Sequence, residues 1–256
     1  MMNLFDLTGK TVVAFGGNST LGAAICKGLA GHGAKIAIIG RNLEKAEKVV
    51  QEIEAEGGTA KAFKADVSTR EDVVKVAEDI EKWSGSFEVL LNLPGKNSTT
   101  PFLELEMDEY DDIMDVNLKG TVVVNQIFAK KMIDKGTKGS IINISSVSST
   151  TPLSRVFTYS VSKAGVNSVT QYLARELAPY GIRVNAIIPG FFPAEQNRKI
   201  LDDARIESIM NHTPMKRFGE AEELQGAAVW LASDKASSFV TGALIRVDGG
   251  FGSMTI

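Results

Sequence analysis

Tyr159 and Lys163 stand four positions apart in Tyr-Ser-Val-Ser-Lys and could together transfer a proton. Apolar residues recur at near-helical intervals from Tyr159 to Glu176, which predicts a helix whose i and i+4 side chains share one face. A positive charge beside a phenol stabilises the phenolate. We therefore expect Lys163 to lower the pKa of Tyr159 from its ordinary value of ~10 toward the working range of an acid/base catalyst. The alternative is a surface pair, because Tyr-x-x-x-Lys also arises by chance.

A glycine-rich turn near the start of the chain could bind phosphate. It lies between an apolar run and a helical pattern, where backbone amides and the positive end of a helix can approach a pyrophosphate. A glycine turn required for steric reasons alone is the alternative. The candidate cofactor-binding residues of this turn are Gly16, Asn18, Ser19, Thr20, Leu21 and Gly22.

The ends of the next two apolar runs bear on the choice of dinucleotide. An acidic residue after the second run would bind the ribose hydroxyls of NAD, but Gly40 and Arg41 stand there. Arginine suits a phosphate through its planar donor fork, so NADP is favoured and NAD stays possible. Asp66, followed by Val67, could accept a hydrogen bond from the adenine amino group or could cap the following helix.

These candidate residues must be positioned by alternating strands and helices. The apolar runs are nearly continuous, as in parallel strands that are covered on both faces. This alternation predicts an α/β fold, a doubly wound parallel (Rossmann) sheet of about seven strands with helices on both faces. We expect residues 1–256 to form one dinucleotide-binding domain with an embedded substrate loop at about 190–215. The predicted strands are Thr11–Phe15, Lys35–Ile39, Lys61–Lys64, Val89–Leu93, Ser140–Ile144, Arg183–Ile188 and Ala243–Val247.

The composition narrows the classes of partner. The 256 residues are 44% hydrophobic with a formal net charge of −3 and no block of basic residues, so we expect no nucleic-acid partner. The single cysteine, Cys26, excludes an intramolecular disulfide and suits the cytoplasm. We expect neither a signal peptide nor a membrane span. His32 and His212 have no partners at metal-ligand spacing, so no metal site is predicted.

Further motifs follow one another in order along the second half of the chain. They are Asp-Val-Asn-Leu-Lys-Gly at 115–120, Ile-Asn-Ile-Ser-Ser at 142–146, Arg-Val-Asn-Ala at 183–186, Pro-Gly at 189–190, Val-Thr-Gly at 240–242 and Val-Asp-Gly-Gly at 247–250. With the tyrosine and lysine pair, they make the protein resemble the short-chain dehydrogenase/reductase family over essentially its whole length.

The resemblance implies a hydride-transferring enzyme with four catalytic residues. Tyr159 gives a proton to the substrate carbonyl oxygen, and Ser146 polarises that oxygen. Lys163 lowers the pKa of the tyrosine and holds the nicotinamide ribose, while Asn117 kinks its helix and supports a proton-relaying water. Ser145 is a rival that the spacing disfavours. The resemblance also implies a homotetramer and a further set of cofactor contacts: Asn92, Gly95, Tyr159, Lys163, Pro189 and Gly190.

Two segments depart from the family pattern. The family turn T-G-x-x-x-G-x-G falls on Phe15 to Gly22, so that Phe15 replaces its threonine and Thr20 its middle glycine. Asn-Leu-Pro-Gly at 92–95 replaces Asn-Asn-Ala-Gly, and Pro94 removes one backbone donor. These changes concern cofactor binding, and they keep open a dinucleotide-binding sensor or regulatory protein with little catalysis.

The segments 189–198, 212–219 and 236–242 resemble one branch of this family, the D-mannonate oxidoreductases, also called fructuronate reductases. This resemblance implies a sugar acid as the small-molecule substrate, because an arginine can bind a carboxylate bidentately. Gluconate-type polyol acids and 3-oxoacyl thioesters stay open as alternatives. The candidate substrate-binding residues are Ser146, Tyr159, Arg155, Gln196, Asn197 and Arg198.

Overall fold

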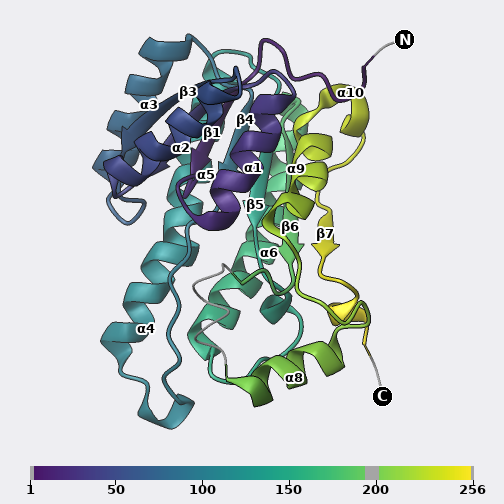
Figure 1. The fold of residues 1–256 in the computed structure, drawn as a ribbon. Helices are drawn as coiled ribbons and strands as arrows, with labels where there is room; N and C mark the ends of the chain where they lie inside the picture. Colours follow the sequence, from purple (N-terminus) through teal and green to yellow (C-terminus); the bar gives the residue numbers. More distant parts are fainter. Residues whose placement is uncertain (1–2, 194–201, 255–256) are drawn as a thin grey trace.

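The sheet predicted from the sequence is present. The computed structural model describes residues 3–193 and 202–254, and its seven strands run parallel in the order β3-β2-β1-β4-β5-β6-β7 (Figure 1). The prediction of a doubly wound parallel sheet is confirmed, and β3 begins two residues earlier than predicted. The strands are β1 (Thr11–Phe15), β2 (Lys35–Gly40), β3 (Thr59–Lys64), β4 (Val89–Asn92), β5 (Ser140–Ile144), β6 (Arg183–Pro189) and β7 (Leu244–Val247).

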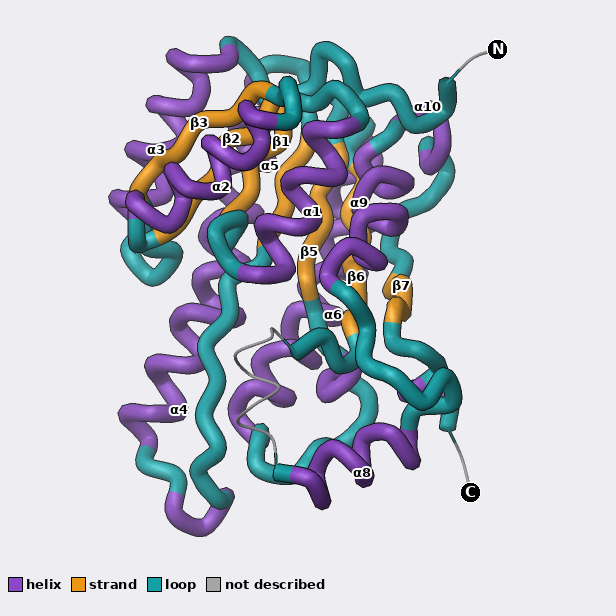
Figure 2. Tube along the Cα trace, in the orientation of Figure 1, coloured by secondary structure: helices purple, strands orange, loops and turns teal. Residues whose placement is uncertain are grey.

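Helices connect the strands, as the tube in Figure 2 shows. The α-helices are α1 (Thr20–Gly31), α2 (Leu43–Ala55), α3 (Arg70–Ser84), α4 (Met107–Met114), α5 (Gly120–Asp134), α6 (Phe157–Leu177), α8 (Asp203–His212), α9 (Gln225–Ala232) and α10 (Asp234–Ser237). The 3-10 turns are η1 (Phe102–Glu104), η3 (Val147–Ser149), η4 (Ala178–Tyr180), η5 (Ala221–Leu224) and η6 (Phe251–Ser253). The turn η2 (Asp115–Lys119) is π-helical and joins α4 directly to α5.

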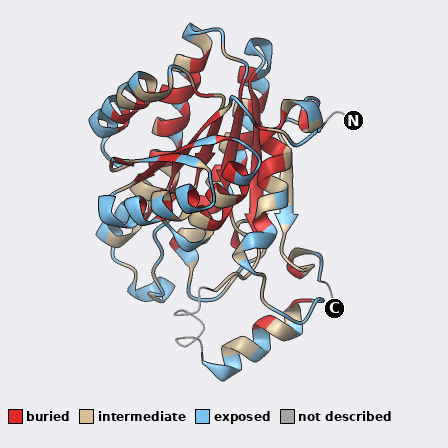
Figure 3. Ribbon diagram, turned by 45° about the horizontal axis from the view of Figure 1, so that its top comes forward, coloured by how far each residue is buried: buried red, intermediate tan, exposed pale blue. Residues whose placement is uncertain are grey.

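Alternate residues of each strand enter two separate cores. Val12 and Ala14 of β1 pack with α1, α2 and α9, whereas Val13 and Phe15 pack with α3, α5 and α6. Successive strand side chains point to opposite faces of a sheet. Because both faces are covered, the central strands β1, β4, β5 and β6 are buried along their length (Figure 3), which explains their continuous apolar runs, whereas the edge strands β3 and β7 are partly exposed.

The order of the strands reverses between β1 and β4, and the carboxyl ends of the strands lie on one side of the molecule. The segment before α4 and the helix α8 extend beyond this side (Figure 1). In open α/β sheets ligands bind at such a switch point. Helix α8 forms the later part of the predicted substrate loop, while the assignment of one domain stays a prediction.

Membrane spans and metal clusters are both absent from the described ranges. No helix within residues 3–193 and 202–254 is long and apolar enough to cross a bilayer. In the same ranges, no group of three or more histidine, cysteine or acidic side chains is arranged to hold a metal ion. Cys26 is a buried thiol in the core between the sheet and α1.

Candidate active site

Tyr159 and Lys163 lie in the first turns of α6, as the spacing predicts. The Nζ atom of Lys163 is 5.7 Å from the centroid of the Tyr159 ring. This ammonium is buried and donates hydrogen bonds to the carbonyl oxygens of Ile144, at 2.9 Å, and Pro94, at 3.2 Å. The lysine thereby joins the start of α6 to the carboxyl ends of two central strands.

The pKa values of the two groups differ from the prediction. Burial raises the pKa of Tyr159, and a hydrogen bond with Ser146 opposes that rise without reversing it. Burial also lowers the pKa of Lys163 to about 8. The predicted lowering of the tyrosine pKa is therefore wrong. The ammonium bonds to backbone carbonyls rather than to the phenol oxygen, so that desolvation of the phenolate dominates.

Ser146 and Ser145 have different surroundings. The Ser145 hydroxyl donates to the carbonyl oxygen of Lys163 at 3.1 Å and is buried. The Ser146 Oγ accepts from the amide and the hydroxyl of Ser148, at 3.2 and 3.1 Å, and lines a cavity together with Tyr159. The geometry favours Ser146 as the serine that reaches a ligand, because the hydroxyl of Ser145 is used in holding α6.

Asn117 lies in the π-helical turn η2 and is fully buried. Its Nδ2 donates to the carbonyl oxygen of Lys96 at 2.8 Å and to the Ser162 Oγ at 3.0 Å. Its Oδ1 accepts from the Lys96 amide at 2.7 Å. A π turn widens a helix by one residue and is frequent at functional sites. Here it allows Asn117 to tie the segment after β4 to α6.

The turn between β1 and α1 is shaped for close approach. Gly16 has a φ of 76°, and a Cβ at this residue would lie 2.8 Å from the carbonyl oxygen of Leu93. A Cβ at Gly22 would lie 2.2 Å from the Gly16 carbonyl oxygen. Ser19 caps α1 by accepting from the Gly22 amide at 3.1 Å. The turn therefore presents the start of α1 to the neighbouring cavities.

Two cavities adjoin this turn and share Ser19, Leu93 and Gly95 in their walls. Their combined walls contain most of the predicted cofactor-binding residues: Gly16, Asn18, Ser19, Thr20, Leu21, Arg41, Asp66, Val67, Gly95, Tyr159, Lys163, Pro189 and Gly190. Gly22 supports the turn without lining either cavity. The two cavities together fit a dinucleotide that lies across the carboxyl ends of the strands. The cavity that Arg41 lines is near β2, and the cavity that Lys163 lines is near Tyr159.

The prediction that Asn92 contacts the cofactor is not supported by its position. Asn92 is buried below the cavities, and its Nδ2 donates to the Oδ1 atoms of Asn125, at 2.7 Å, and Asn143, at 3.0 Å. The Asn143 Nδ2 in turn donates to the Thr170 Oγ1 at 3.0 Å. This network links β4, β5, α5 and α6. Asn92 points into it because strand alternation directs its side chain to that face.

The departures from the family pattern have structural explanations. Phe15 packs edge to face on Phe128, with ring centroids 5.5 Å apart, so that a buried aromatic contact stands where the family has a hydroxyl. Thr20 begins α1 and lines the larger cavity. Pro94 lacks an N–H, but its carbonyl oxygen accepts from Lys163.

A larger side chain at the end of β2 would have to displace the side chain of Asn18. A Cβ at Gly40 would lie 2.4 Å from the side chain of Asn18, whose Nδ2 donates to the Asn42 carbonyl oxygen at 3.2 Å. Arg41 is exposed and lines the same cavity as Asp66. Burial acts to raise the pKa of Asp66, but hydrogen bonds from Ser68 and the charge of Arg41 lower it.

Asp66 does not cap helix α3. The residue at the N-cap position is Thr69, and the Asp66 carboxylate instead accepts from the amide and hydroxyl of Ser68 at 3.0 and 2.7 Å. The alternative of a helix cap at Asp66 is therefore wrong, since the helix begins later than that alternative requires. The position of Asp66 in the cavity wall leaves its predicted adenine contact as a prediction.

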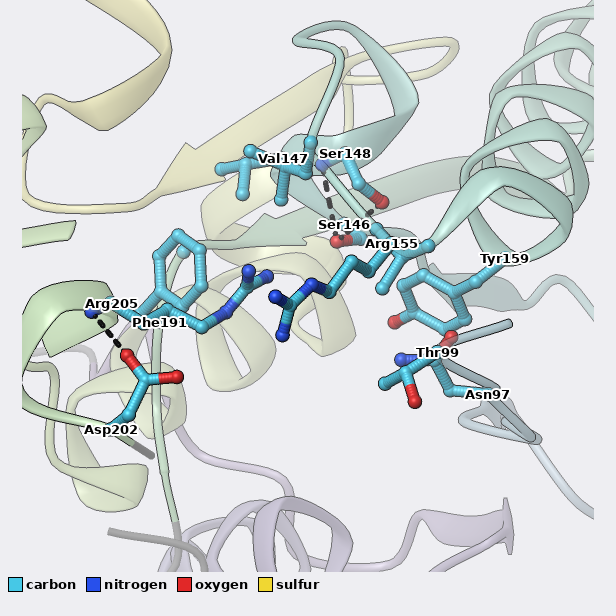
Figure 4. A pocket seen from close by; sticks show the side chains of 13 residues that line it. Asn97, Thr99, Ser146, Val147, Ser148, Arg155, Tyr159, Phe191, Asp202 and Arg205 are labelled. Carbon is cyan, nitrogen blue, oxygen red and sulfur yellow. Dashed lines mark hydrogen bonds between the residues drawn. The ribbon is translucent and has the colours of Figure 1, made fainter. Parts of the chain in front are cut away.

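A further cavity, of about 360 Å³, lies beside Tyr159 and Ser146 (Figure 4). Arg155 lines it, as expected of a substrate-binding residue, whereas Gln196, Asn197 and Arg198 lie outside the described residues. Arg205, in the first turn of α8, lines it as well and was missed from the sequence. The signal available was a cation at the start of a helix within the predicted substrate loop.

The protein is similar over nearly its whole length to known proteins. A family model described as Enoyl-(Acyl carrier protein) reductase matches residues 16–252. The protein is 39% identical to an uncharacterized oxidoreductase, UxuB, of Bacillus subtilis over 96% of each chain. A gluconate 5-dehydrogenase from Burkholderia cenocepacia, solved with NADP and tartrate, is 35% identical over 98% of each chain with a TM-score of 0.93. A structure from Haemophilus influenza with bound NAD, described as a D-mannonate oxidoreductase, is 34% identical over 99% of each chain with a TM-score of 0.92.

Proposed function

The protein belongs to the short-chain dehydrogenase/reductase family of oxidoreductases, and we propose that it acts on the carbonyl or secondary alcohol of a sugar acid with NAD(P) as the hydride carrier. The observation that carries the proposal is the meeting of Ser146 and Tyr159 in one cavity, directly beside the cavity that contains Lys163 and the start of α1. A carbonyl at this junction can receive a proton from the phenol on one side and a hydride from the other.

Four residues have separate roles in this proposal. Tyr159 donates its phenolic proton to the carbonyl oxygen during reduction, and Ser146 donates a hydrogen bond to the same oxygen as negative charge develops there. The Lys163 ammonium, which two backbone carbonyls hold 5.7 Å from the centroid of the tyrosine ring, stabilises the resulting phenolate by its charge. Asn117 positions the segment at Lys96 and the hydroxyl of Ser162 behind the tyrosine.

We infer that the dinucleotide is NADP in preference to NAD. The nicotinamide, when bound, supplies the hydride. The Gly40–Arg41 segment supports NADP, since residue 40 carries no carboxylate to repel a phosphate and Arg41 offers a donor fork for one. One of the similar structures contains NADP and another contains NAD, so the preference has to be measured for this protein.

We also infer a cytoplasmic homotetramer. This proposal rests on the family resemblance. Large apolar side chains that the single protomer leaves exposed support it, for example Leu103, at 94%, and Phe239, whose side chain is fully exposed. Light scattering of the purified protein tests the assembly, and a monomer at micromolar concentration contradicts it.

An absorbance assay of NAD(P)H oxidation tests the proposed reaction. The substrates are D-fructuronate and 5-keto-D-gluconate, each with NADPH and with NADH at matched concentrations. We expect turnover of at least one acid, and faster turnover with NADPH. Equal or faster turnover with NADH contradicts the proposed role of Arg41 in binding a phosphate and leaves the proposed substrate class unaffected. An absence of turnover with both acids contradicts the proposed substrate class, and turnover of a 3-oxoacyl thioester would then replace it.

A further inference from the structure

Two guanidinium groups enter the cavity that Ser146 and Tyr159 line. Figure 4 shows the side chains of Arg155 and Arg205 pointing toward one another within this cavity. Arg155 belongs to the segment between η3 and α6, and Arg205 belongs to the first turn of α8. Two elements distant in sequence therefore bring like charges together beside the proposed reaction centre.

Within the part of the wall that the structure describes, the charges of this cavity are unbalanced. Among residues 3–193 and 202–254, neither guanidinium forms an ion pair: Arg205 donates to the Ser154 Oγ at 3.1 Å and to the Ser154 carbonyl oxygen at 3.4 Å, both neutral acceptors. Asp202 is the one acidic residue in the described wall, and its Oδ1 accepts from the backbone amide of Arg205 at 2.7 Å. Two cations facing one carboxylate leave a positive field that attracts an anion.

The backbone at Arg155 indicates that its position is specified by the surrounding structure. Its φ is 65°, in the left-handed region that is disfavoured for a residue with a Cβ. Such conformations persist where the surrounding structure holds them, and they occur often at ligand-binding sites. The bond from Arg205 to Ser154, the neighbour of Arg155, connects α8 to the same segment. The two arginines are thus parts of one local arrangement.

We infer that Arg155 and Arg205 together bind the carboxylate of the substrate, an inference that rests on the proposed sugar-acid reaction. Each guanidinium is a planar donor fork that matches a carboxylate. The reacting carbonyl lies at Ser146 and Tyr159, and Asn97 and Thr99 in the same wall offer partners for sugar hydroxyls. The arginine pair consequently selects acids over neutral polyols with the same number of carbons.

Titration calorimetry with two matched ligands tests this inference independently of turnover. D-Gluconate and D-glucitol differ in having a carboxylate or a CH2OH group at one end. Both are titrated into the full-length protein at saturating NADP, for the wild type and for the variants R155Q, R205Q and R155Q/R205Q. The exposed Arg175 on α6 lies outside the cavity walls, so that R175Q is the matched control for loss of a positive charge.

We expect the wild type to bind D-gluconate at least tenfold more tightly than D-glucitol. Each glutamine variant should lose roughly 10- to 100-fold in affinity for D-gluconate, as for a charged hydrogen-bonding group, with affinity for D-glucitol unchanged. R205K should retain part of the preference, and R175Q all of it. A wild type that does not distinguish the two ligands overturns the inference, as do variants that keep the wild-type preference.

The outcome separates this inference from the proposed reaction. If no acid is turned over but D-gluconate binding depends on both arginines, the carboxylate site stands and the proposed reaction fails. If an acid is turned over and the ratio of its kcat/KM to that of a neutral ketose is unchanged in R155Q/R205Q, the reaction stands and the carboxylate site fails.

Discussion

The two sides of the site are built differently. The catalytic floor, which consists of Asn117, Ser146, Tyr159 and Lys163, comes from helices and a strand end, and its Asn117 and Lys163 are almost completely buried. The substrate rim, which consists of Asn97, Thr99, Arg155, Asp202 and Arg205, comes from connecting segments and the first turn of α8.

Their hydrogen bonds differ in the same way. The buried polar groups of the floor bond to backbone atoms: the Asn117 amide bonds to Lys96 in the segment after β4, and the Lys163 ammonium bonds to Ile144 at the end of β5. Within the described residues, the rim guanidiniums bond at most to one neutral serine. A rigid floor can maintain one proton transfer while an exposed rim changes the ligand. Similar proteins of the same fold are described with different sugar acids, so we expect the rim rather than the floor to differ among them.

Removing the phenolic hydroxyl of Tyr159 should reduce catalysis more than any other change in the floor or the rim. Tyr159→Phe keeps the ring contact with Lys163 and removes the proton donor. We expect kcat/KM for the reduced acid to fall by about 10²- to 10⁴-fold, with the dissociation constant for NADPH within a few-fold of that of the wild type. Stopped-flow measurements of hydride transfer and fluorescence titration of NADPH check both parts. Wild-type turnover in this variant would show that Tyr159 is not the proton donor.

Ser146→Ala should come next, because one donor to the developing oxyanion is lost. A fall of about 10²- to 10³-fold in kcat is expected. Ser148→Ala is the matched control: its hydroxyl contacts the Ser146 Oγ at 3.1 Å, but in this proposal it does not contact the carbonyl. Steady-state kinetics that give the two variants equal losses would mean that Ser146 acts only through local structure.

The buried ammonium of the floor should make stability depend on pH. The pKa of Lys163 is about 8 in the folded protein, against 10.5 for an ordinary lysine, so that the protonated form is disfavoured by folding. The stability that this residue contributes is fully present above 10.5, the pKa in the unfolded chain. It is lost as the pH falls from there through the folded pKa of about 8. Relative to Lys163→Met, the wild type should gain about 3 kcal/mol in free energy of unfolding as the pH rises from 8 toward 10.5. Urea unfolding of both cofactor-free proteins at several pH values measures this difference, and a constant difference contradicts the assigned pKa.

Relieving the strained backbone at Arg155, in the rim, should stabilise the protein, and this should be the smallest of the four effects. Arg155→Gly relieves the left-handed backbone, so we expect a change in free energy of unfolding between zero and about 1 kcal/mol of stabilisation. Arg155→Ala loses the same guanidinium but keeps the backbone strain, and it should be the less stable of the two. Chemical denaturation ranks them, and identical stabilities would show that the conformation of Arg155 is not strained.

The parts of the molecule that depend on local pattern were predictable. Continuous apolar runs gave the strands to within two residues, and the i, i+4 spacing placed Tyr159 and Lys163 on one helix face. The spacing also preferred Ser146 to Ser145, in agreement with their surroundings. These features follow from the periodicity of strands and helices.

The parts that depend on packing were not predictable. The direction of the Tyr159 pKa shift depends on burial and on a hydrogen bond with Ser146, neither of which is encoded in a spacing. Asn92 was assigned to the cofactor by the family resemblance, whereas its bonds to Asn125 and Asn143 depend on how distant elements pack. Arg205 was missed because its place opposite Arg155 results from how α8 folds back across the ends of the strands.

The π-helical turn at Asn117 constrains the number of residues in the segment from α4 to α5, in addition to the residue types found there. An α-helix rotates by about 100° for each residue. Deleting any one residue between Met107 and Asp134 could turn α4, η2 and α5 into a single regular helix. That helix would be better hydrogen-bonded, but its two halves would be rotated relative to each other from their present orientation. Either Asn117 would lose its hydrogen bonds with Lys96, or the apolar face of α5 would no longer pack on the sheet. The irregular turn sets the phase between two faces of one helix, so that substitutions in this helix should be tolerated far more often than single-residue deletions.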